Sequence, residues 1–125
     1  MTDLLEFDIP DGLWMSANDR THWAEKARRT RDVRRLARIK AGGHGPAPTP
    51  VLVTAVIGYP RAGTADPGNA APTVKAILDG LTDAGLWPDD DSRHVIGPLY
   101  RRGPNTGTRG LHRVRLVLTA QEVAW

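Results

Sequence analysis

The sequence predicts an α+β fold: a two-layer domain with a mixed β-sheet and two helices, in the order β-α-β-α-β-β. Four stretches of β-branched or alternating apolar residues predict strands, and two stretches with apolar residues at helical spacing predict helices. A chain of 125 residues is long enough for one ordinary hydrophobic core, so we expect a single domain over residues 1–125.

The first half of the chain is expected to form strand, helix and strand. Leu4–Ile9 alternates as a strand and ends in a Pro-Asp-Gly turn. The segment 16–19 offers several N-cap side chains, so a helix is expected from about 19 to 41, where a Gly- and Pro-rich connector stops it. Residues 51–59 are rich in β-branched side chains and predict the second strand.

A second helix is expected from about 70 to 84. Asn69 is its expected N-cap and Gly85 its expected C′ residue. Gly80 lies in mid-helix, which indicates close approach of another backbone. The buried face falls at 3.6-residue spacing and consists of Val74, Ile77, Leu78 and Leu81.

The last part of the chain is expected to form a hairpin within 93–119. Residues 94–100 and 112–119 predict its two strands, and the Gly- and Arg-rich segment between them predicts its turn. A hairpin that follows two helical crossovers makes the sheet mixed.

Charge is segregated along the chain, although the net charge is only +3. Residues 20–40 hold nine Arg or Lys and two acids, and 93–115 hold six Arg and no acid. Separate basic blocks favour a polyanion partner. Arg28, Arg31, Arg35 and Arg38 share one helix face, and the candidate DNA contacts are these four with Arg20, Arg101 and Arg102.

Composition narrows the other possibilities. No cysteine is present, so disulfides and thiolate metal sites are excluded. The N-terminus does not resemble a signal peptide and the apolar run 51–57 is too short to span a bilayer, so we expect a cytoplasmic protein with no membrane partner. Trp14, Trp23 and Trp87 are expected as core or interface anchors, and Trp125 is set apart as terminal.

Acidic residues bracket the second helix, which carries a single lysine, Lys75. Asp66 lies before the helix, and Asp89, Asp90 and Asp91 follow it. Mg²⁺ binds one or two protein carboxylates and takes water and phosphate oxygens in its remaining positions. An acidic pocket on a basic protein is therefore typical of a metal-dependent nuclease.

The Asp66-Pro-Gly-Asn69 segment, Lys75, Asp79 and the Gly85–Asp90 run together resemble the RusA family of Holliday-junction resolvases. The likeness covers nearly the whole chain. It implies a homodimeric, Mg²⁺-dependent endonuclease, with Mn²⁺ as a substitute, that cuts branched four-way DNA in recombination and repair. It also implies that Asp66, Lys75 and Asp90 are catalytic, and that the metal ligands are Asp66, Asp90, Asp89 and Asn69.

Two departures from the family pattern bear on activity. Gly68 stands where the family has a second aspartate, and two extra residues separate Asn69 from Lys75. Asn69, Asp79, Asp89 or Asp91 could complete the metal shell in place of the missing carboxylate. The alternative function is a non-catalytic protein that binds branched DNA and keeps the fold.

Overall fold

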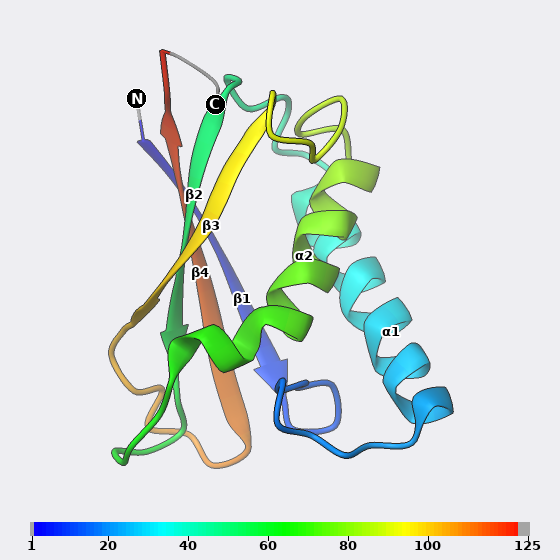
Figure 1. Cartoon of the computed structure of the whole chain (residues 1–125), viewed down its shortest axis with the longest axis vertical. Helices are drawn as coiled ribbons and strands as arrows, with labels where there is room; N and C mark the ends of the chain where they lie inside the picture. Colours follow the sequence, from blue (N-terminus) through cyan, green and yellow to red (C-terminus); the bar gives the residue numbers. More distant parts are fainter. Residues whose placement is uncertain (1, 123–125) are drawn as a thin grey trace.

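The computed structural model describes residues 2–122, and Trp125 lies outside them. Two helices pack on one face of a four-stranded mixed sheet, as the sequence predicts (Figure 1). The elements follow the predicted order β-α-β-α-β-β, with a short 3₁₀ helix, η1, before α2. Their bounds are β1 Thr2–Pro10, α1 Trp23–Ala41, β2 Val51–Gly58, η1 Pro67–Ala70, α2 Ala71–Asp83, β3 Val95–Arg102 and β4 Leu111–Ala120.

The predicted hairpin between the last two strands is wrong. The sheet order is β1-β4-β2-β3, in which β4 is antiparallel to β1 and β2, and β3 is parallel to β2 at the edge. A strand-helix-strand crossover through α2 makes β2 and β3 parallel. The segment after β3 then crosses the end of β2, where Gly103 and Thr106 donate backbone hydrogen bonds to Ile57 and Tyr59. It therefore delivers β4 to the other side of β2.

The core lies between the sheet and the two helices. Alternate residues of β2 are buried, because successive side chains of a strand point to opposite faces. α2 buries Val74, Ile77 and Leu81 completely, which confirms the predicted apolar stripe. Trp87 is also buried and donates from Nε1 to Thr82 Oγ1 at 2.7 Å, so it is a core anchor as expected.

Two glycine predictions on α2 are confirmed. A Cβ added to Gly80 would lie 2.3 Å from the Arg34 carbonyl oxygen and 2.8 Å from Ala37 Cβ, so the backbones of α1 and α2 meet there. Gly85 has φ +84°, the left-handed conformation expected of a residue that ends a helix.

The predicted start of α1 and the predicted N-cap of α2 need correction. α1 begins at Trp23 rather than near residue 19, because the Asp19 carboxylate accepts the Ser16 N–H at 2.8 Å and closes a separate turn. His22 caps α1 instead, through Nδ1. Asn69 does not cap α2: it lies within η1, and the helix N-cap is Ala70, which makes no side-chain bond.

Candidate functional site

The loop after β1 is fastened to the start of α2 by one buried hydroxyl. Thr73 is fully buried, and its Oγ1 both accepts from the Met15 N–H and donates to the Met15 carbonyl, each at 2.8 Å. Two residues after Met15, the Ala17 N–H donates to the carbonyl of Asn69 in η1 at 2.8 Å. Breaking the bonds between Thr73 and Met15 would leave buried polar groups unpaired, so the loop is held firmly against the start of α2.

This attachment creates a polar pocket around Asp66. The pocket has a volume of about 260 Å³ and contains Asp66 and Asn69, two of the predicted metal ligands. Asp66 Oδ1 also accepts the Gly68 N–H at 3.0 Å and so caps η1. The lining residues are Trp14, Ser16, Asn18, Tyr59, Thr64, Ala65, Asp66, Asn69 and Ala70.

Gly68 lies directly beside Asp66. A Cβ built on Gly68 would be 3.3 Å from Asp66 Oδ1. The position at which the resembled family carries its second aspartate is therefore adjacent to the first. An aspartate there would bring two carboxylates together at the edge of the pocket.

Lys75 forms a second polar cluster on the exposed side of α2. Its Nζ lies 2.8 Å from Asp90 Oδ2 and 2.9 Å from Asp79 Oδ1. The hydrogen bond to Asp90, and then that to Asp79, raises the pKa of Lys75, and the same Lys75 bond lowers the pKa of Asp90. The side chain of Lys75 is 63% exposed, so the ammonium is accessible to a ligand.

Of the three consecutive aspartates, only Asp90 bonds to Lys75. The Asp89 carboxylate accepts the Asp90 N–H at 2.7 Å. Asp91 turns toward the start of β3, where it pairs with Arg93 at 3.1 Å and with His94 Nδ1 at 2.8 Å. The geometry therefore favours Asp90 over its neighbours as the aspartate that acts with Lys75.

The structure brings together Asp66 with Asn69, and Lys75 with Asp79 and Asp90, as two separate groups. Within residues 2–122, no three His, Asp or Glu side chains are gathered closely enough to hold a metal ion. Asp66 and Asn69 do supply the hard oxygen donors that Mg²⁺ prefers, and such a site takes its remaining oxygens from water and phosphate. The donor chemistry of the pocket thus fits Mg²⁺, whereas Asp90 is held by Lys75.

The predicted DNA-contacting arginines lie in different surroundings. Arg28 bonds to Glu25 at 2.6 Å and to Asp32 at 3.1 Å, so its charge is largely compensated. Arg102 bonds to the carbonyls of the 61–63 loop and lies over the Tyr59 ring at 4.9 Å. Arg20 is exposed on the loop before α1, and Arg101 is exposed on β3. Arg31, Arg35 and Arg38 instead line one groove.

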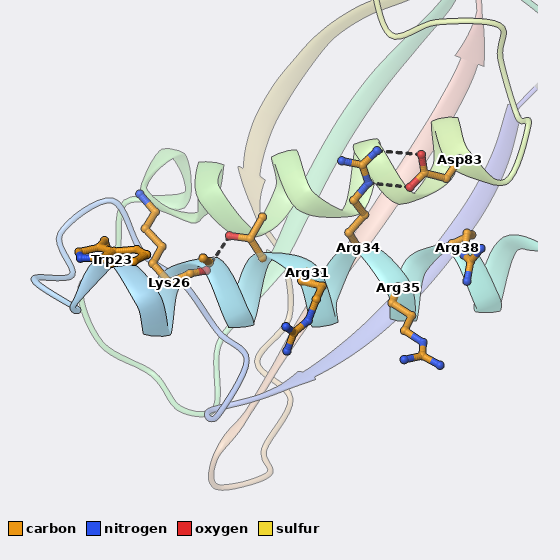
Figure 2. A pocket seen from close by; sticks show the side chains of 9 residues that line it. Trp23, Lys26, Arg31, Arg34, Arg35, Arg38 and Asp83 are labelled. Atoms are coloured by element: carbon orange, nitrogen blue, oxygen red, sulfur yellow. Dashed lines mark hydrogen bonds and ion pairs between the residues drawn. The ribbon is translucent and has the colours of Figure 1, made fainter.

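That groove has a volume of about 990 Å³ and lies between α1 and the end of α2 (Figure 2). Two of its cations, Lys26 and Arg34, are not among the predicted DNA contacts, and Trp23 is among the predicted core or interface anchors. Trp23 is 76% exposed, so as a core anchor that prediction is wrong. Helical spacing of residues 23, 27, 30 and 34 could have indicated a shared face. The groove residues are Trp23, Lys26, Ala27, Thr30, Arg31, Arg34, Arg35, Arg38 and Asp83.

No protein-family model matches this chain, and no curated protein sequence matches it. Within residues 2–122, neither helix combines the length and the apolar character needed to cross a membrane.

Proposed function

We propose that this protein is a Mg²⁺-dependent, structure-selective endonuclease that resolves four-way DNA junctions, in the manner of the RusA family that its sequence resembles. The observation that carries the proposal is the pocket in which Asp66 and Asn69 meet. A basic groove on the neighbouring helix supplies a surface for DNA phosphates.

Asp66 and Asn69 would hold the metal ion, with water and phosphate oxygens completing its shell. When bound, Mg²⁺ polarises the phosphate and lowers the pKa of a coordinated water. Mn²⁺ is expected to substitute.

Lys75 acts as a hydrogen-bond donor to a phosphate oxygen on which negative charge develops. Its pKa is raised by Asp90 and Asp79, so it stays protonated and does not serve as a base. The ammonium has three N–H donors and the two carboxylates accept from two of them, which leaves the third for a phosphate oxygen. Asp90 then positions the lysine while the phosphate is bound.

A homodimer would present two such sites for paired cuts on a symmetric junction. The sheet face away from the helices supports this part of the proposal, because no described element covers it (Figure 1). Register places Leu4, Val117, Thr54 and Leu99 in one row across all four strands, and the leucines at its ends are 53% and 54% exposed. Such a row suits contact with a second copy.

The alternative remains a non-catalytic protein that binds branched DNA. Gly68 contributes no carboxylate beside Asp66, and Lys75 compensates Asp90. Both observations are compatible with a fold that has kept its basic surface and lost its metal site.

Cleavage of a labelled four-way junction with Mg²⁺, Mn²⁺ or a chelator separates the two functions. We expect Asp66→Asn to abolish cleavage, and Asp90→Asn to lower its rate by at most the factor of about 10²–10³ expected for loss of Lys75, because Asp90 positions that lysine. Both variants should bind junctions nearly as the wild type does, because the groove that contacts DNA phosphates lies on α1. Asp8→Asn is the matched control, since that exposed aspartate lies on β1 and pairs with Arg113. If both test variants cleaved at the wild-type rate, these aspartates would have no part in cleavage and the proposed site would be wrong.

Gly68→Asp is the complementary variant. If the chain binds Mg²⁺ weakly for want of one carboxylate, this change should increase cleavage and lower the Mg²⁺ concentration that cleavage requires. A wild type that binds junctions but never cleaves them, and that Gly68→Asp does not activate, would favour the binding protein.

A further inference from the structure

Trp23 is an exposed aromatic side chain at one end of a charged groove. It is the first residue of α1, and 76% of its surface is accessible. Its ring lies beside His22 with ring centroids 5.5 Å apart, tilted by 33° rather than stacked. An indole has a large apolar face, and leaving it in water forgoes the free energy that burial would provide. The position is suited to a flat ligand.

The groove that starts at Trp23 is strongly positive (Figure 2). Its one acidic residue, Asp83, accepts two hydrogen bonds from Arg34, at 2.6 and 2.8 Å, and is therefore already compensated. Arg31 pairs with Asp32 at 3.3 Å, so the uncompensated positive charge along the groove comes from Lys26, Arg35 and Arg38. A ligand that fills this groove must be anionic along its length.

The length of the groove suits several nucleotides of a nucleic-acid strand. α1 rises about 22 Å between Trp23 and Arg38, which exceeds the roughly 3.4 Å between neighbouring phosphates of a strand in a duplex several times over. Arginine recognises phosphate with several donors in a planar fork, which makes a row of arginines well suited to a repeated phosphate.

We propose that the groove of α1 binds a single-stranded segment of DNA, with its phosphates along Lys26, Arg35 and Arg38 and one unpaired base stacked on Trp23. An unpaired base is required because paired bases within a duplex have both faces covered by their neighbours. The inference rests on the proposed function for its substrate, branched DNA, whose branch point is where unpaired bases arise.

The groove adjoins the Lys75 cluster. Asp83, at the groove, lies one helical turn after Asp79, which bonds to Lys75. The pKa of Arg34 is raised, mainly by its hydrogen bond to Asp83 and further by the negative charges of Asp79 and Asp90. The charges of the Lys75 cluster therefore act on a groove residue. A strand lying in the groove would therefore pass close to the lysine that the proposed function uses.

Binding is measured by fluorescence anisotropy with a chelator present, using a labelled oligothymidine and a blunt hairpin duplex of equal charge. We expect Trp23→Ala to weaken binding of the oligothymidine roughly five- to hundredfold, to change duplex binding less than twofold, and Trp23→Phe to restore most of the loss. Ile39→Ala is the matched control, because Ile39 is also a large exposed side chain of α1 but lies outside the groove. Circular dichroism checks that each variant is folded.

Any of four results would overturn the proposal. If Trp23→Ala weakens binding of the strand and the duplex equally, or weakens neither, then no base stacks on Trp23. Competition by polyglutamate as strong as that by the oligonucleotide would make the groove a site for acidic peptides. A change from dimer to monomer in Trp23→Ala on sedimentation would make it a protein interface.

The two proposals fail separately. A wild type that binds the strand in chelator through Trp23 but never cleaves junctions in Mg²⁺ would refute only the endonuclease. A wild type that cleaves, with Trp23→Ala binding the oligothymidine normally, would refute only the stacked strand.

Discussion

Gly80→Ala tests the contact that sets α1 beside α2. On helix propensity alone, alanine is favoured over glycine in mid-helix by about 1 kcal/mol, so a solvent-facing position would be stabilised. At Gly80 the new Cβ would meet the Arg34 carbonyl oxygen at 2.3 Å and Ala37 Cβ at 2.8 Å. Non-bonded heavy atoms prefer about 3.5–4.0 Å, so the helices would have to separate by about 1 Å.

The expected loss follows from these opposing terms. Overpacking of a tight core contact costs about 1–3 kcal/mol, and the upper part of that range applies because a backbone atom cannot rotate away. After the propensity gain, the free energy of unfolding should fall by about 2 kcal/mol. For a chain of 125 residues this lowers Tm by about 7 °C.

Thermal and urea denaturation measure the change, with Gly43→Ala as control. A Cβ at Gly43 meets nothing within 4 Å, and its φ is not positive, so its stability should change by less than about 0.5 kcal/mol. A Tm for Gly80→Ala that equals or exceeds that of the wild type would refute the close helix contact. The position of the end of α2 beside the groove on α1 would then need a different explanation.

Three further predictions concern charge. Lys75→Ala should lower the single-turnover rate of junction cleavage by about 10²–10³ without unfolding the protein, because it removes one hydrogen-bond donor to the charge that develops on the phosphate. A wild-type rate would show that Lys75 has no part in cleavage. Changing Arg35 and Arg38 together to Ala should remove two phosphate contacts, so the slope of log K for junction binding against log salt should become shallower by about 2. An unchanged slope would mean that these arginines face solvent or a protein partner and do not contact DNA. Hydrogen bonds to Gly45 and Asp3 raise the pKa of His44, while those from the Leu4 N–H and His44 lower the pKa of Asp3. The pair therefore stabilises the fold above the ordinary Asp pKa of 3.8 and below the ordinary His pKa of 6.5, and its effect fades as pH rises through the folded pKa of His44. In urea denaturation, Asp3→Asn should thus cost on the order of 0.5 kcal/mol at pH 5.5 and almost nothing at pH 8.5, whereas an equal cost at both would exclude the ion pair.

Local patterns were sufficient to predict what each segment becomes. The 3.6-residue spacing of Val74, Ile77 and Leu81 and the β-branched stretch of β2 are properties of neighbouring residues, so they can be identified without knowing the fold. The roles of Gly80 and Gly85 could be predicted for the same reason. A glycine in mid-helix indicates a close backbone contact, and a glycine just after a helix indicates its C-terminal end. The proximity of Asp66 and Asn69 also followed from short sequence separation.

Partners distant in sequence could not be predicted in this way. The sequence showed two strands separated by a turn-like segment, and only the crossover through α2 made β3 parallel to β2 and left β4 to enter between β1 and β2. Helical spacing placed Arg28 on the same ridge as Arg31, but it did not show that Glu25 and Asp32 both bond to Arg28.

The sequence by itself determined the element types, the two-layer class and the segregation of charge, because these depend on local periodicity and composition. Tertiary structure alone decided that Thr73 fastens the loop after β1 to the start of α2, that Asp90 rather than Asp89 or Asp91 reaches Lys75, and that Trp23 is exposed at the end of a basic groove. Each of these depends on how two segments pack, and packing is fixed by the shape of the whole core rather than by the residues on either side.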